Sequence, residues 1–120
     1  MTTTPIVLIY AAAAGLGGYV LLLWFRKARR PGLIAVHLLL GAAALEMLFA
    51  FLRLKDLGDN GAASRLGTIA VTLMALAMFS GFVAPVLGKQ HRTAANSLLA
   101  THVCSGVAGF LMVLALAAQF

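Results

Sequence analysis

The sequence predicts an all-α integral membrane protein, a four-helix bundle made of two tandem helical hairpins. Of its 120 residues, 62% are hydrophobic and 10% are charged, and the mean hydropathy is +1.02. A soluble domain carries about 25% charged residues. A membrane-spanning helix needs about 20 mostly apolar residues, and four such segments cover 5–25, 33–52, 66–87 and 97–118. The short connections leave no room for a soluble domain, so we expect a single membrane domain spanning residues 1–120.

The first apolar segment has the position of a secretory signal peptide. Such a peptide carries positive charge before its apolar stretch, whereas the opening MTTTPIVLIY contains no Lys or Arg. We therefore expect this segment to be retained as the first membrane helix.

The basic residues predict the orientation in the membrane. The first and third connections together contain six Lys or Arg, namely Arg26, Lys27, Arg29, Arg30, Lys89 and Arg92. The second connection contains three, Arg53, Lys55 and Arg65, beside two aspartates. Cytoplasmic loops carry the excess of Lys and Arg, so the first and third connections are expected in the cytoplasm and both termini outside. We therefore attribute the net charge of +6 to residues that set the orientation in the membrane and contact lipid headgroups. We expect a multi-pass protein of the bacterial cytoplasmic membrane, in contact with the lipid bilayer and with no nucleic-acid partner.

An internal repeat supports the two hairpins. GLIAVHLLLGAAALEMLFA aligns with SLLATHVCSGVAGFLMVLA, so that His37 and Gly41 match His102 and Gly106. Upstream, the GYV at 18–20 resembles the GFV at 81–83 after a two-residue offset. In such a repeat, related by an axis along the membrane normal, the second and fourth helices run in the same direction.

The repeat places the two histidines at one depth. Each lies four or five residues into its predicted helix, about 6–8 Å below the cytoplasmic boundary at a rise of 1.5 Å per residue. Positions i and i+4 share a helix face, so Gly41 and Gly106 leave room beside the imidazoles of His37 and His102. Haem iron takes axial histidine ligands, and this pattern predicts one haem b held by His37 and His102. Arginine pairs strongly with carboxylates, so Arg26, Arg30 and Arg92 are the residues expected near the haem propionates.

A family resemblance points the same way. The stretch GFVAPVLGKQHRTAANSLLATHVCSGVAGFL, residues 81–111, with its basic segment running into a His-x-x-x-Gly, resembles the four-helix haem cores of the cytochrome b561 and ferric-reductase-like membrane families. The resemblance implies electron transfer through b-type haem, carried here by His37 and His102, to or from a quinone or protein partner. Those families often hold two haems with four histidine ligands. Here no histidine lies in the outer half of a predicted helix, so one haem near the cytoplasmic face is expected.

Other functions fit parts of the same pattern. A magnesium chlorin usually takes one axial ligand, so each histidine would then hold its own chlorophyll-type pigment in an accessory subunit of a respiratory or photosynthetic complex. A zinc or copper ion lacks third and fourth ligands at suitable spacing. Common enzyme motifs are absent, which favours an electron-transfer protein over a stand-alone enzyme.

Glu46 is the acidic residue that lies deep in a predicted helix. It would serve proton-coupled transport in a small transporter, or form a hydrogen bond to Thr68, Thr72 or a partner subunit. Small residues in the first segment, Ala11, Gly15 and Gly18, form a stripe that suits packing against other membrane subunits or a second copy.

Overall fold

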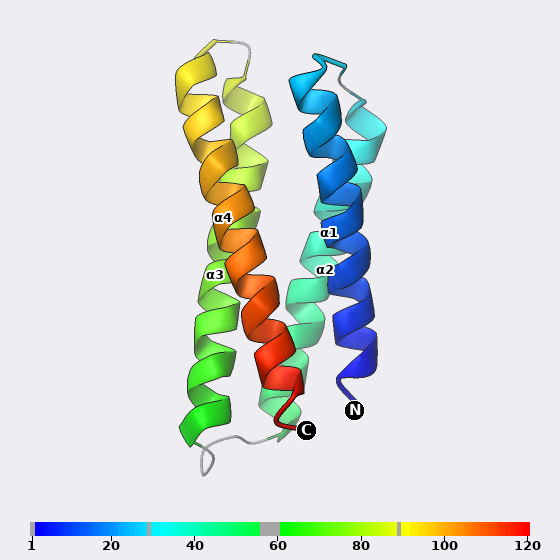
Figure 1. Ribbon diagram of the computed structural model, residues 1–120, viewed down its shortest axis with the longest axis vertical. Coiled ribbons are helices and arrows are strands. Elements are labelled where there is room, and N and C mark those ends of the chain that lie inside the picture. The colour runs from blue at the N-terminus through cyan, green and yellow to red at the C-terminus, as the bar shows by residue number, and fades with distance from the viewer. Residues whose placement is uncertain (1, 29, 56–60, 89) are drawn as a thin grey trace.

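The computed structural model describes residues 2–28, 30–55, 61–88 and 90–120, and the described residues are all-helical, without strands. The four helices are α1 (Thr4–Phe25), α2 (Pro31–Lys55), α3 (Gly61–Leu87) and α4 (Arg92–Ala117) (Figure 1). All four are long and apolar enough to cross a membrane, which confirms the all-helical prediction and its four segments. The boundaries differ mainly at α3 and α4, which each begin five residues earlier than predicted, and at α2, which ends three residues later.

The helices pair as two antiparallel hairpins, α1 with α2 and α3 with α4, and the hairpins meet through contacts of α2 with α3 and of α1 with α4. The bundle is elongated, with extents of 48 × 22 × 17 Å. Both termini lie at one end, and the α1–α2 and α3–α4 turns lie at the other (Figure 1). We call these the terminal end and the basic end, because Arg26, Lys27, Arg30 and Arg92 lie at or beside the two turns.

Backbone hydrogen bonds close the α1–α2 turn. The Ala28 N–H donates to the Leu23 carbonyl and the Lys27 N–H to the Trp24 carbonyl, the pattern of a Schellman cap. Lys27 is in the left-handed region, with φ of 57°. The Arg30 carbonyl then accepts from the Leu33 and Ile34 N–H groups in the first turn of α2, where Pro31 has no N–H that would need an acceptor. The capped turn thus holds a cluster of cations next to the bundle.

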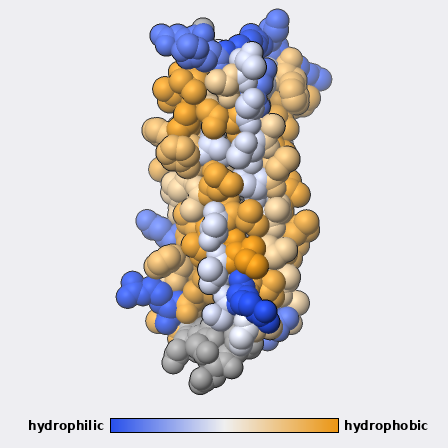
Figure 2. All heavy atoms as spheres, turned by 90° about the vertical axis from the view of Figure 1, so that its left-hand side faces the viewer, coloured by the Kyte–Doolittle hydropathy of each residue, from blue (hydrophilic) through white to orange (hydrophobic). Residues whose placement is uncertain are grey.

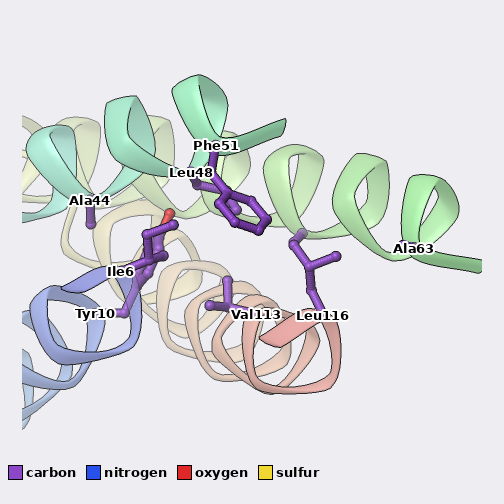
Figure 3. Close-up of a cluster of buried hydrophobic side chains, with 9 residues drawn as sticks. Ile6, Tyr10, Ala44, Leu48, Phe51, Ala63, Val113 and Leu116 are labelled. Atoms are coloured by element: carbon purple, nitrogen blue, oxygen red, sulfur yellow. The ribbon is translucent and has the colours of Figure 1, made fainter. Parts of the chain in front are cut away.

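The apolar core lies toward the terminal end. All four helices contribute to one buried cluster, shown in part in Figure 3: Ile6, Tyr10, Ala44, Leu48, Phe51, Ala63, Ala70, Val113 and Leu116. By contrast, none of the described residues from 14 to 43 is buried. The part of the α1–α2 hairpin nearest the basic end therefore has no packed core of its own.

Small residues let α3 and α4 approach closely. Alanines recur on α3 at seven-residue spacing and are at most 5% exposed, at Ala63, Ala70, Ala77 and Ala84. A seven-residue spacing keeps one seam facing the partner helix, and small side chains allow close backbone packing in membranes. The corresponding line on α4 is Ala95, His102, Gly109 and Leu116, buried except for the half-buried His102. His102 therefore occupies a seam position in a tight helix pair.

The face seen in Figure 2 is largely apolar, with hydrophilic residues gathered toward its two ends. Large exposed side chains such as Leu39, Phe79 and Leu111 are more than half accessible. The exposed hydroxyls of Thr68, Thr72 and Thr101 donate to carbonyls four residues earlier in their own helices, so they need no water to satisfy them. This surface is consistent with contact with a lipid bilayer.

Candidate functional site

The structure brings His37 of α2 and His102 of α4 together. Their ring centroids are 5.8 Å apart and the ring planes are at 88°, and both residues are half-buried. They come from different hairpins, so the imidazole pair bridges the two halves of the bundle. The equal depth that the repeat predicts for them agrees with this contact.

Each imidazole packs against a glycine of its own hairpin. A Cβ built on Gly17 of α1 would lie 2.7 Å from Cε1 of His37. One built on Gly81 of α3 would lie 2.5 Å from Nδ1 and 2.6 Å from Cε1 of His102. Carbon contacts are normally about 3.5–4.0 Å, so any larger residue at either glycine would displace the ring.

The sequence alignment did not identify this glycine pair. It matched Gly18 with Gly81, whereas a Cβ on Gly18 would meet nothing within 4 Å, and the glycine equivalent to Gly81 by contact is Gly17. The available signal was the repeated Ala-x-x-x-Gly of Ala13–Gly17 and Ala77–Gly81, each followed by a histidine 20 or 21 residues later.

The two imidazoles differ in hydrogen bonding. Nδ1 of His102 lies 2.6 Å from the carbonyl oxygen of Ala77. Because a carbonyl only accepts, this nitrogen carries the proton, and in the neutral imidazole Nε2 then keeps the lone pair. The backbone of Ala13, the counterpart of Ala77 in the first hairpin, lies close enough to the His37 ring to interact with it. Nδ1 of His37 is nevertheless buried and makes no hydrogen bond that meets distance and angle criteria to any described residue.

The two glycines that follow the histidines have different surroundings. A Cβ on Gly41 would meet nothing within 4 Å, so space is open beside α2 at that point. At Gly106 the nearest atom is the Ala77 Cβ at 3.9 Å, so Gly106 belongs to the α3–α4 contact. Of the two predicted lining residues, Gly41 is the one that leaves open space.

The predicted arginines lie at the basic end. Arg30 precedes His37 by seven residues and Arg92 precedes His102 by ten, which is about 10 and 15 Å along the helix axes, and both side chains are exposed. His91 is also exposed and precedes the first residue of α4. These residues can act together with the histidine pair only through a bound group that extends toward this end.

Glu46 does not make the predicted hydrogen bond to Thr68 or Thr72. It is exposed on α2, and the two hydroxyls donate to Ser64 and Thr68 carbonyls. It lines a shallow surface hollow with Phe49 and Arg53 of the same helix. Glu46 is therefore separate from the histidine pair.

The donor set at the pair consists of two nitrogens. Within the described part of the chain, no three His, Cys, Asp or Glu residues come close enough to hold a metal ion together. The arrangement suits a metal whose other ligands come from a prosthetic group. No protein-family model matches the chain, and no curated protein or solved structure matches it either.

Proposed function

We propose that the protein is a membrane-embedded b-type cytochrome that holds one haem b between α2 and α4, with His37 and His102 as axial ligands. The observation that carries the proposal is the 5.8 Å approach of two imidazoles from different hairpins. In a four-helix bundle, cofactor sites are formed by side chains on facing helices.

The separation of the two ring centroids is compatible with a shared metal. With metal–imidazole nitrogen bonds of about 2 Å, two opposed histidines have ring centroids separated by roughly 6 Å. The observed 5.8 Å is close to this value, and the 88° between the rings is compatible with ligation because each ring can turn about its bond to the metal. A porphyrin supplies four nitrogens, which explains why two protein ligands suffice.

The surroundings fit a flat apolar group. No described residue between 14 and 43 is buried. A haem inserted between the hairpins beside this part of α1 and α2 would therefore displace no packed core of that hairpin. The exposed Arg26, Arg30 and Arg92 lie at the basic end, where they would pair with the carboxylates of a bound haem. By the positive-inside rule this is the cytoplasmic end.

When bound, haem supplies one-electron chemistry. The chain's contribution is to hold the group by two imidazoles, cover it with apolar helices and set its potential through ligand identity and burial. We propose that it relays single electrons to or from a quinone or a protein partner, alone or as a subunit of a larger assembly in the bacterial cytoplasmic membrane.

The test is a dithionite-reduced minus air-oxidised absorption spectrum of protein purified in detergent with haem supplied. We expect a six-coordinate b-type signal that is lost or becomes five-coordinate in His37→Ala and in His102→Ala. His91→Ala is the matched control, because this histidine lies in the turn, and its spectrum should equal that of the wild type. A colourless wild type, or two variants with unchanged spectra, would overturn the proposal, and a chlorin spectrum would identify a pigment subunit instead.

A further inference from the structure

Both imidazoles of the pair are confined by a glycine, but their hydrogen bonds differ. Gly17 and Gly81 each confine one ring, and neither position tolerates a Cβ without displacement of that ring. Contact with a glycine therefore does not by itself distinguish His37 from His102. The difference lies in what each Nδ1 contacts and in how tightly the helix that carries each ring is packed.

His102 is fixed in orientation. The 2.6 Å distance to the Ala77 oxygen is shorter than the 2.9–3.0 Å common for N–H···O bonds. A histidine ligand that donates its other N–H to a backbone carbonyl has its tautomer and ring orientation set, and its basicity as a ligand raised. The α4 helix that carries it is packed through buried small residues, among them Ser105 and Gly109, against α3.

His37 lacks this support. Its Nδ1 is buried and makes no hydrogen bond to a described residue that meets distance and angle criteria, although the Ala13 backbone lies beside the ring, and a buried polar atom without a well-formed hydrogen bond is unfavourable. The neighbouring Gly41 leaves open space on the same helix, and the surrounding stretch from residue 14 to 43 contains no buried described residue. Movement of the His37 ring away from the pair would relieve the unpaired nitrogen and disturb little packing.

We propose that His102 is the permanent ligand of the site and His37 the exchangeable one, so that the His37 side admits a small neutral ligand such as carbon monoxide. The inference rests on the proposed function, since it concerns the same site. One neutral donor replaces another, so the exchange needs neither a proton nor an electron.

The first experiment needs no haem. Imidazole ¹⁵N–¹H NMR of the uniformly labelled, haem-free protein in detergent, assigned with His37→Leu and His102→Leu, reports the tautomer and exchange rate of each ring. We expect an Nδ1–H on His102 that exchanges with water at least tenfold more slowly than the ring proton of His37. Equal exchange rates, or an Nε2–H tautomer on His102, would overturn the inference whether or not the protein binds haem.

The second experiment compares the haem-supplied variants. His37→Leu should retain at least half of the wild-type haem in a five-coordinate state and bind carbon monoxide at least tenfold more tightly than the reduced wild type, because no ligand must leave. His102→Leu should retain less than a tenth of the wild-type haem. Circular dichroism of both variants confirms that they are folded, and His37→Gly replaces His37→Leu if that variant is not.

The outcomes are separable. Equal haem retention in the two folded variants would overturn the inference while leaving the haem proposal standing. A wild type that takes up no haem would overturn the proposed function itself, and the NMR result would still show whether the two rings differ.

Discussion

Replacement of Gly81 by alanine tests the packing on which the site depends. The glycine lies on α3, directly against the His102 ring, and a Cβ there would lie 2.5 Å from Nδ1. Ordinary contacts between non-bonded atoms are about 3.5 Å or longer, so the ring or the helix must move by about 1 Å. That shift also breaks the hydrogen bond from Nδ1 of His102 to the Ala77 carbonyl.

The expected magnitude follows from three contributions. Overpacking a close contact costs about 1–3 kcal/mol, and loss of the hydrogen bond about 0.5–1.5 kcal/mol. Alanine has a higher helix propensity than glycine, which offsets about 1 kcal/mol. We therefore expect Gly81→Ala to lower the free energy of unfolding by about 2 kcal/mol. Gly18→Ala is the matched control, because a Cβ at Gly18 meets nothing within 4 Å, and it should be neutral or more stable by up to about 1 kcal/mol.

The assay is reversible unfolding of the haem-free protein in mixed micelles, followed by circular dichroism as the fraction of sodium dodecyl sulfate increases. Gly17→Ala should have a stability between those of the two variants, because its Cβ would meet Cε1 of His37 at 2.7 Å but Nδ1 of that ring makes no hydrogen bond that meets distance and angle criteria. If Gly81→Ala proved as stable as Gly18→Ala, the close packing of His102 against α3 would be refuted.

Three further predictions concern the rest of the bundle. Phe51→Ala should lower the free energy of unfolding by about 3–5 kcal/mol, since Phe51 is fully buried. Phe49 is exposed, so Phe49→Ala should change the free energy of unfolding by less than about 0.5 kcal/mol. Similar losses at both positions would contradict the placement of the core. Glu46→Gln should change the free energy of unfolding by less than about 0.5 kcal/mol and leave the haem spectrum unchanged, because Glu46 is exposed and apart from the histidines. Loss of the haem spectrum in this variant would show that Glu46 has a role in the site. In a Cys104→Ser background, which removes the exposed Cys104 thiol, the Lys27→Cys variant should react with a membrane-impermeant maleimide only from the cytoplasmic side. Labelling of intact cells from outside would reverse the proposed orientation.

Much of the fold follows from local properties of the chain. Hydropathy summed over about 20 residues identifies a spanning helix without knowledge of its neighbours, and all four segments were predicted in this way. The α3 and α4 starts were missed by five residues because their first turns, at Gly61–Arg65 and Arg92–Asn96, carry polar residues. Backbone hydrogen bonding continues a helix through such residues, and hydropathy does not report it.

The histidine pair was only partly predictable. A repeat in register shows that His37 and His102 have equivalent positions on parallel helices, and helix rise converts position into depth. Neither the repeat nor the helix rise gives the distance between two helices of different hairpins. Their contact at 5.8 Å depends on how the hairpins pack.

By itself, the sequence determined the number of helices, the excess of cations at one end and the matched positions of the two histidines, because each of these depends on composition or on periodicity along a single segment. Only the tertiary structure decided that Gly17 is the partner of His37, that the Ala77 carbonyl accepts a hydrogen bond from His102, and that Glu46 is exposed and away from Thr68 and Thr72. The spacing from glycine to histidine is 20 residues in the first hairpin and 21 in the second. A difference of one residue turns a helix position by about 100°, so the glycine that faces each ring is set by how the two helices of the hairpin pack against each other.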